Sequence, residues 1–314
     1  SRAVGAMVGL AVGDAIGTTL EFKVRGSYPL LTDMVGGGPF KLKAGQWTDD
    51  TSMALALMDS LLAKGSLDEA DLIERFVRWH EKGKYSSTGR CFDIGITTRN
   101  ALDRWKKSGH PFAGATAPST AGNGSLMRLA PIAVRYWQDR DKLRDGAARQ
   151  SRTTHGAPEA VDACAAYAEV LADAIEGRPR SEVLRTRSES YAGSIAGIMA
   201  GSWRGKRRDE IEATGYVAHS LEAALWCIAR TGSFAEAVLM AANLGEDADT
   251  TAAITGQLAG ALYGLDAIPQ HWREKIAWGE LITDMASDLF DAGHRATSSS
   301  WENLQPLPDR HRRP

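Results

Sequence analysis

The sequence predicts an all-α protein that folds as a single compact multi-helix domain, and three observations lead to this fold class. Helix-capping and helix-breaking residues divide the 314 residues into a succession of apolar, helix-periodic segments. No segment alternates apolar and polar residues convincingly, and Asn123-Gly124 lies in a loop of small residues instead of joining two β-branched runs. The contents of 43% hydrophobic and 24% charged residues are those of an ordinary globular chain.

The first helix is expected over residues 3–16, where small and apolar residues dominate. Glycine recurs at every fourth position, which lets a neighbouring helix approach closely. This stripe consists of Gly5, Gly9, Gly13 and Gly17. A signal peptide is the alternative, but only Arg2 supplies a basic charge and Asp14 interrupts the run well short of the ~20 residues that a membrane span needs. We therefore expect a buried central helix and no membrane span.

Helix-capping and helix-breaking residues predict where the remaining helices begin and end. A Gly/Pro-rich loop at residues 26–45 precedes a helix over residues 48–64, which Gly65 ends. Capping boxes at residues 66–69 and 233–236 predict the starts of two more helices, the first reaching about residue 82. Further helices are expected over residues 93–107, 126–138, 155–176, 215–229, 237–242, 252–262 and 269–292.

Residues 294–314 are rich in Ser, Pro and Arg, and we expect them to form a loosely ordered C-terminal tail. The helical domain is then expected to span residues 1–293.

Charge and cysteine content narrow the possible partners and the compartment. A net charge of −2 and a pI near 6.4 do not favour binding to nucleic acid or to an anionic membrane surface. The three cysteines, Cys91, Cys164 and Cys227, lie far apart and form no C-x-x-C pair. This spacing argues against a disulfide framework or a zinc site and favours a reducing compartment. We expect a cytoplasmic protein and a monomer.

Two acidic motifs stand out, Thr48-Asp49-Asp50-Thr51 and Asp247-Ala248-Asp249-Thr250, and a strongly helical run follows each. One aspartate or threonine at such a place is an ordinary N-cap, so two simple caps are one interpretation. A second carboxylate would repel the first, however, and a cap needs only one acceptor. On a helix Asp247 and Asp249 would point to nearly opposite sides, so both face one site only if Asp247 precedes the helix and Asp249 begins it.

If the two helix ends meet, four carboxylates and at least two hydroxyls share one place, and their repulsion requires neutralising cations. Hard oxygen ligands in this number suit two Mg²⁺ or Mn²⁺ ions. A calcium-binding EF-hand loop starting at Asp247 is excluded, because its sixth position is Ala252 instead of Gly and its twelfth is Leu258 instead of Glu.

Six motifs in a fixed order make the sequence resemble the ADP-ribosylglycohydrolase family, from about Gly5 to Gly293. They are Gly13-Asp14-Ala15-Ile16-Gly17 with Glu21-Phe22, Thr48-Asp49-Asp50-Thr51, Asp93-Ile94-Gly95, Gly122-Asn123-Gly124-Ser125-Leu126-Met127-Arg128, Thr154-His155, and Asp247-Ala248-Asp249-Thr250. The resemblance implies an all-α fold with a binuclear metal centre in a cleft between helices.

The resemblance also implies roles for the acidic residues. The metal ligands would be Thr48, Asp49, Asp50, Asp247, Asp249 and Thr250. Catalytic roles would fall to Asp50 and Asp249, to Glu21 beside the metal centre, and to Asp93 near the scissile end of the sugar. The alternatives are a solvated end of the first helix for Glu21 and a helix N-cap for Asp93.

The substrate-binding residues implied by the resemblance would hold ADP-ribose. The segment that would hold its diphosphate and ribose is Gly122, Asn123, Gly124, Ser125, Leu126, Met127 and Arg128. His155 would lie near the ligand, and Tyr216 would stack on the adenine. The alternatives are a structural tie for Arg128, a helix cap for His155 and core packing for Tyr216.

The function implied by the resemblance is metal-dependent hydrolysis of the N-glycosidic bond between ADP-ribose and a modified protein side chain. Arginine is favoured as the acceptor, because the likeness is nearer to the dinitrogenase reductase-activating branch than to the serine-specific one. The partners would be an ADP-ribosylated protein and the product ADP-ribose. Two alternatives stay open, namely a hydrolase of serine-linked or free O-acyl ADP-ribose and a non-catalytic ADP-ribose-binding module.

Overall fold

The computed structural model describes the backbone of residues 1–302 and the side chains of residues 1–295. Within these residues the secondary structure is helical, with three isolated β-bridges and no strand, as the sequence predicts. The α-helices are α1 (Arg2–Gly17), α2 (Asp49–Lys64), α3 (Glu69–Lys82), α4 (Ile96–Ser108), α5 (Ala130–Tyr136), α6 (Arg140–Arg152), α7 (Pro158–Glu176), α8 (Arg180–Val183), α9 (Ser194–Met199), α10 (Val217–Arg230), α11 (Phe234–Ala242), α12 (Ala248–Tyr263), α13 (Gln270–Lys275) and α14 (Gly279–Glu302). Short 3₁₀ turns are η1 (Thr18–Leu20), η2 (Pro118–Thr120), η3 (Arg208–Glu210) and η4 (Leu265–Ala267).

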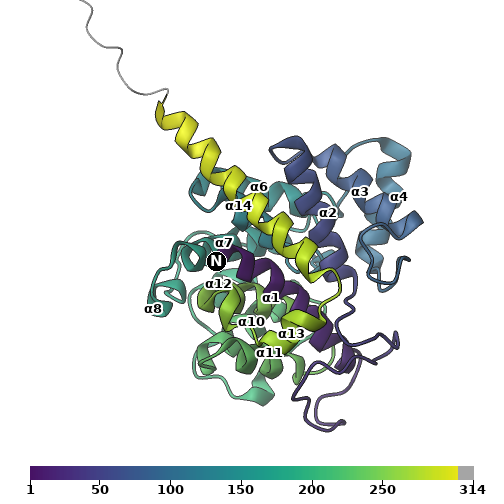
Figure 1. The fold of residues 1–314 in the computed structure, drawn as a ribbon, viewed down its shortest axis with the longest axis vertical. Coiled ribbons are helices and arrows are strands. Elements are labelled where there is room, and N and C mark those ends of the chain that lie inside the picture. The colour runs from purple at the N-terminus through teal and green to yellow at the C-terminus, as the bar shows by residue number, and fades with distance from the viewer. Residues whose placement is uncertain (303–314) are drawn as a thin grey trace, which may run out of the picture.

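Helices α1 and α12 form the central pair, with α2, α3 and α4 on one side and α10 and α11 below them in the view of Figure 1. The glycine stripe of α1 makes this pairing possible. A Cβ added at any of its four glycines would lie only 2.1 to 2.3 Å from a carbonyl oxygen of α12. Helix α12 contributes Gly256 and Gly260 to the same contact. The predicted close approach of a neighbouring helix is therefore confirmed.

The stretch Arg2–Leu20, which contains α1, is long and apolar enough to cross a membrane by length and composition alone. However, 94% of the apolar window is buried inside the protein. Packing within the domain therefore accounts for the apolar character of this helix.

One predicted helix end and one predicted start are confirmed, and one predicted start is wrong. Helix α2 ends at Gly65 in a left-handed conformation, and Ser233 caps α11 by accepting a hydrogen bond from the Glu236 N–H. Helix α3 is capped by Asp68 instead of Ser66. The reason is that Leu67 is buried and its N–H donates to the Tyr136 hydroxyl at 3.1 Å, a contact outside the helix.

The structure also differs from the predicted helices in the middle of the chain. Residues 124–128 form turns, so the helix expected over 126–138 is reduced to α5. Helix α6 is not predicted by the sequence analysis, because Leu143 is the only large apolar residue that it buries. A local signal was present in Asp139, whose side chain accepts a hydrogen bond from the Lys142 N–H.

The C-terminal part contains two helices where one was expected over residues 269–292. Trp278, with a positive φ of 56°, lies between α13 and α14. Helix α14 continues to Glu302, past the expected domain end at residue 293. Residues 303–314 of the predicted tail lie outside the described residues, so the loosely ordered tail stays a prediction.

Candidate active site

The two acidic motifs meet at the N-terminal ends of α2 and α12. Thr48 and Asp247 occupy the N-cap positions, yet neither side chain makes a capping hydrogen bond. The Thr48 hydroxyl oxygen instead lies 3.0 Å from Asp249 Oδ2 and 3.1 Å from Asp50 Oδ2. The interpretation of two simple caps is therefore wrong, and the predicted convergence of residues some 200 positions apart is present in the structure.

Seven carboxylates cluster here, in three overlapping groups whose oxygens lie within 4.8 Å of one another. The groups are Asp14, Asp50 and Asp249; Glu21, Asp247 and Asp249; and Asp49, Asp93 and Asp249. Asp249 belongs to all three. The cluster thus contains each acidic residue that the sequence analysis selects, together with Asp14, to which it assigned no role.

Several oxygens of this cluster have no partner in the protein. Asp50 Oδ1, Asp249 Oδ1 and Glu21 Oε2 are buried without a hydrogen bond. An unpaired buried carboxylate oxygen is costly, so each of these atoms requires a proton or a cation. A donor set made only of carboxylate and hydroxyl oxygens suits hard divalent cations such as Mg²⁺ and Mn²⁺. The residues present therefore fit the expected metals.

Burial and mutual repulsion strongly perturb the ionisation of the cluster. Burial, followed by repulsion from neighbouring carboxylates, raises the pKa values of Asp49, Asp50 and Asp249 well above their usual range. The same two causes raise the pKa of Glu21 to about 11. Nearby cations would lower all of these pKa values, because positive charge stabilises the ionised carboxylates.

Glu21 and Asp93 reach the cluster from two different loops. Glu21 follows η1 and is only 3% exposed, so the alternative of a solvated helix end is wrong. Asp93 has a positive φ of 61° and precedes α4, whose N-cap is Gly95, so Asp93 is not the cap either. Burial raises the pKa of Asp93 to about 7, against the lowering effect of hydrogen bonds with Asp249 and Glu21.

A cavity of about 590 Å³ lies against this cluster. Its acidic lining residues are Glu21, Asp49, Asp93, Glu246 and Asp247. The exposed side chains of Phe22 and Ile96 also line it, and we call these two residues together with Glu246 the mouth. Thr48, Asp50 and Asp249 are buried behind the lining.

The glycine-rich segment forms another wall of the cavity, through Gly122, Asn123, Gly124 and Met127. The Asn123 side-chain amide donates to Asp247 Oδ2 at 2.7 Å, which joins this wall to the carboxylate cluster. His155 also lines the cavity. A Cβ at Gly124 would lie 2.6 Å from His155 Cε1, so the two residues pack without room for a side chain between them.

His155 is almost fully buried, and its Nδ1 lies 2.8 Å from the Thr154 hydroxyl. Burial lowers the pKa of His155 to about 3. The imidazole is therefore neutral at physiological pH and offers a ligand a hydrogen bond or a flat surface, not a positive charge.

Four of the expected substrate-binding residues do not line the cavity, and three of them are fully buried. Ser125, Leu126 and Arg128 are fully buried and absent from its lining. The Arg128 guanidinium donates to the Gln150 side chain and main chain at 2.8 Å and lies 4.4 Å from the Phe76 ring centre. Arg128 thus ties the loop to α6, which is the structural alternative weighed above.

Tyr216 lies beside the cavity without lining it. Its backbone forms an isolated bridge with Gly122, and its hydroxyl donates to Glu159 Oε2 at 2.5 Å. Its ring contacts His219 edge-on at 4.9 Å. Tyr216 is half-buried and packs against the hydrophobic core, which agrees with the alternative of core packing, and adenine stacking stays a prediction.

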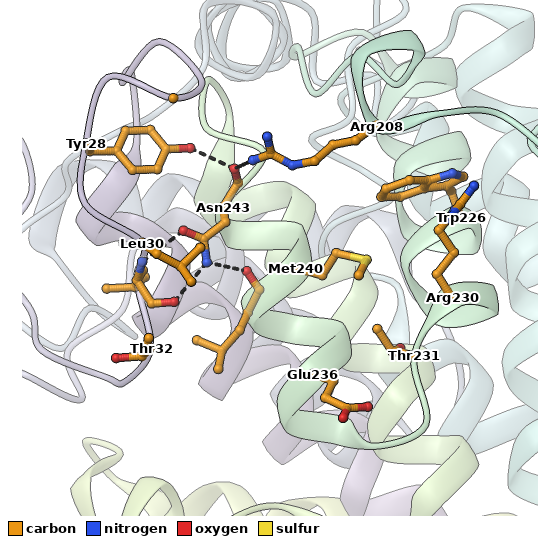
Figure 2. A pocket seen from close by; sticks show the side chains of 13 residues that line it. Tyr28, Leu30, Thr32, Arg208, Trp226, Arg230, Thr231, Glu236, Met240 and Asn243 are labelled. Carbon is orange, nitrogen blue, oxygen red and sulfur yellow. Dashed lines mark hydrogen bonds between the residues drawn. The ribbon is translucent and has the colours of Figure 1, made fainter.

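A second and larger cavity, of about 740 Å³, lies between the loop at residues 26–32 and helices α10 and α11 (Figure 2). Its walls include Leu30, Trp226 and Met240. Some of its polar groups bond to one another, as where Tyr28 and Arg208 both donate to the Asn243 main-chain carbonyl. It contains no residue of the acidic motifs, so the smaller cavity is the candidate active site.

Comparison with known proteins identifies the family of this chain. The family model described as ADP-ribosylglycohydrolase matches residues 1–298. ADP-ribosylarginine hydrolase Tri1 of Pseudomonas putida (strain GB-1) is 48% identical over 290 residues, which cover 92% of this chain and 78% of that protein. ADP-ribosyl-[dinitrogen reductase] glycohydrolase of Rhodospirillum rubrum is 36% identical over 282 residues, covering 88% and 90% of the two chains.

A solved structure titled "ADP-ribosylglycohydrolase-related protein complex" superposes with a TM-score of 0.83 at 40% identity, covering 93% of this chain and 98% of that one. The family match thus covers nearly the whole chain, and the solved structure shares its helical fold. The chain belongs to the ADP-ribosylglycohydrolase family.

Proposed function

We propose that this protein hydrolyses the N-glycosidic bond between ADP-ribose and a modified arginine of a protein, with the help of two divalent cations, Mg²⁺ or Mn²⁺. One observation carries the proposal. Carboxylates from both acidic motifs converge beside a cavity, and the buried oxygens Asp50 Oδ1 and Asp249 Oδ1 have no partner in the protein.

The cations would be held by the residues of the two helix ends: Thr48, Asp49, Asp50, Asp247, Asp249 and Thr250. Glu21 would lie beside them, since its oxygens are grouped with those of Asp247 and Asp249. When bound, divalent cations supply positive charge that orients and polarises sugar hydroxyls and water. Everything else in the reaction depends on side chains of the chain itself.

The substrate would lie along the glycine-rich wall. A volume of about 590 Å³ is in the range of about 300–1,000 Å³ that is typical of small-molecule sites. Gly122 and Gly124 offer only backbone atoms on this wall, and neutral His155 can hydrogen-bond to a ligand oxygen without adding a charge. Met127 supplies an apolar contact in the same wall.

Asp93 is the residue that we expect to act at C1 of the ribose, the carbon whose bond breaks. As the bond from C1 to the acceptor nitrogen breaks, positive charge develops on the ribose, and a carboxylate close to it stabilises that charge. Asp93 lines the cavity and contacts the cluster through Asp249 and Glu21. It would also accept a proton from the water that attacks C1 and pass it to the departing arginine nitrogen, so that ADP-ribose and unmodified arginine are released.

The mouth suits an arginine acceptor. A guanidinium group pairs with carboxylates and stacks on aromatic faces, and Glu246 and exposed Phe22 offer both. The two residues are held together, because the Phe22 N–H donates to the Glu246 carbonyl at 2.7 Å. The name of the 48% identical relative, an ADP-ribosylarginine hydrolase, supports the same acceptor.

The test is release of ADP-ribose from an arginine-ADP-ribosylated protein, with Mg²⁺ or Mn²⁺ and then with EDTA. We expect release that depends on the metal. Release only from a serine-linked or O-acyl substrate would overturn the arginine assignment and keep the hydrolase. No release from any substrate, with ADP-ribose still bound, would identify a binding module instead.

We also expect a monomer. A location in the cytoplasm is expected as well, since all three cysteines are free in the structure. Light scattering of the purified protein measures the mass of the particle, and a dimer mass would contradict the first expectation.

A further inference from the structure

We propose that Asp14 is a positioning residue for the cation site: it aims the Thr48 hydroxyl so that its lone pairs face Asp50 and Asp249. The inference rests on the proposed cation-binding function and adds a residue to it. Asp14 lies in the buried central helix α1, outside both acidic motifs.

Asp14 accepts four hydrogen bonds from the first turn of α2. Its Oδ1 accepts from the Thr48 N–H at 2.9 Å and from the Thr48 hydroxyl at 2.8 Å. Its Oδ2 accepts from the Thr51 N–H at 3.0 Å and from the Thr51 hydroxyl at 2.7 Å. Four donors therefore surround the two oxygens of the fully buried Asp14, and two of these donors belong to Thr48.

The Thr48 hydroxyl has fewer protons than it has neighbouring carboxylate acceptors. Its hydroxyl oxygen lies 2.8 Å from Asp14 Oδ1, 3.0 Å from Asp249 Oδ2 and 3.1 Å from Asp50 Oδ2. A hydroxyl has one proton and two lone pairs, so it can donate to only one of these three acceptors. Asp14 is the nearest of them, and the adjacent Thr48 N–H donates to the same oxygen.

Once that proton points to Asp14, the lone pairs of Thr48 face two carboxylates. Lone pairs and negative charges repel, and a cation between them converts this repulsion into coordination. Independent support comes from Asp50 Oδ1 and Asp249 Oδ1, which are buried with no partner. Asp14 thereby prepares Thr48 as a neutral oxygen ligand, in the way that outer carboxylates orient metal-binding histidines.

Helix α1, which contains Asp14, also packs closely against α12. A Cβ at Gly13 would lie 2.1 Å from the Ala252 carbonyl oxygen, and a Cβ at Gly17 would lie 2.3 Å from the Ala248 carbonyl oxygen. Helix α1 therefore contacts α12 through glycine and α2 through Asp14. It sets the register between the two helix ends that carry the acidic motifs.

A direct role as a cation ligand is the competing interpretation, since Asp14 oxygens lie within 4.8 Å of those of Asp50 and Asp249. Such a role would require Asp14 to give up hydrogen bonds with Thr48 or Thr51. The two roles predict different coupling between Asp14 and Thr48, which an experiment can measure.

The experiment is a double-mutant cycle on Mn²⁺ affinity, measured by titration calorimetry of the full chain. The variants are Asp14→Asn, Thr48→Val and the double variant. We expect Asp14→Asn to weaken Mn²⁺ binding by about 10–100-fold, as for other residues that orient metal ligands. In the Thr48→Val background the same change should cost less than about 3-fold, because no hydroxyl remains to aim.

Thr51→Val is the matched control, because the Thr51 hydroxyl also donates its proton to Asp14 but forms no hydrogen bond with the Asp50 or Asp249 side chain. Asp14→Asn should keep most of its effect in that background. Equal losses in the wild-type and Thr48→Val backgrounds would overturn the positioning role. An Asp14→Asn protein that does not fold would also overturn it, by making Asp14 a folding residue. Absence of Mn²⁺ and Mg²⁺ binding by the wild type would instead refute the proposed function, and this inference with it.

Discussion

At the residue scale, the site is defined by oxygens that lack partners. Asp249 shows this most clearly, because it is 1% exposed, belongs to all three carboxylate groups and has an unpaired Oδ1. Its surroundings are unfavourable for a negative charge in the absence of cations. The residue therefore serves binding at a cost to the stability of the metal-free protein.

Replacing Asp249 with Asn tests this balance. We expect turnover to be abolished and Mn²⁺ binding to be weakened, because one charged ligand is lost. The metal-free variant should nevertheless unfold at a higher temperature than metal-free wild type at pH 8, since a buried like charge is removed. Activity assays and thermal unfolding in EDTA measure both effects. Wild-type turnover in the variant would refute the two-cation site.

The pH dependence of metal-free stability follows from Asp93 and Glu21. Burial raises the pKa of Asp93 from 3.8 to about 7 and that of Glu21 from 4.5 to about 11. The folded state then binds more protons than the unfolded state above about pH 4, so the free energy of unfolding falls as pH rises. We expect the unfolding temperature in EDTA to decrease from pH 5 to pH 8. Saturating Mn²⁺ should flatten or reverse this slope, and a rise with pH in EDTA would contradict the perturbed cluster.

Gly124→Ala tests the wall of the cavity. The new methyl group would lie 2.6 Å from His155 Cε1, so the imidazole or the loop must move. We expect at least about a tenfold loss of ADP-ribose affinity, which corresponds to about 1.4 kcal/mol, with Mn²⁺ affinity unchanged. Calorimetric titrations with each ligand separate the two effects. An equal loss of Mn²⁺ affinity would mean that the wall and the cation site are not independent.

At the element scale, the decisive contact is between α1 and α12. The period-four glycine pattern is visible in the sequence, because spacing along one helix is a local property. Helix α6 is the opposite case, because its mostly polar sequence does not predict a helix. The helix is nevertheless present, and its Gln150 accepts a hydrogen bond from Arg128. Strong patterns in single helices could thus be predicted, whereas helices held mainly by polar tertiary contacts could not.

Gly9→Ala tests the central contact. The Cβ would lie 2.2 Å from the Gly256 carbonyl oxygen. This oxygen belongs to the backbone of α12, which cannot move aside as the end of a flexible side chain can. We expect the free energy of unfolding to fall by at least about 1–3 kcal/mol, the usual cost of overpacking. Gly197→Ala in α9 is the control, since no atom lies within 4 Å of its Cβ, and it should be neutral or slightly stabilising. Urea denaturation compares the two variants, and equal stabilities would contradict the tight packing.

At the scale of the whole molecule, the core and the cation site are separable. The pairing of α1 with α12 buries apolar and glycine surfaces along almost the whole length of both helices, while the carboxylates gather at one end. The larger apolar cavity has no part in this chemistry, so cavity size alone would have selected the wrong place.

Removal of metal should therefore separate fold from function. We expect EDTA to abolish turnover and to lower the unfolding temperature, since bound cations stabilise only the folded state. The far-UV circular dichroism at 25 °C should stay helical, because the central pair does not depend on cations. Loss of the helical signal in EDTA would show that the cations are needed for folding.

The sequence by itself determined the helical class, the glycine-lined central helix and the two acidic helix ends, because caps, spacing and like-charge repulsion act between neighbours along the chain. Only the tertiary structure decided which side chains face the cavity. In the folded protein Ser125, Leu126 and Arg128 lie in the core, and Glu21 is buried. Asp14 accepts a hydrogen bond from Thr48, which lies 34 positions away in the sequence. Those orientations depend on packing between distant elements, which no local pattern records.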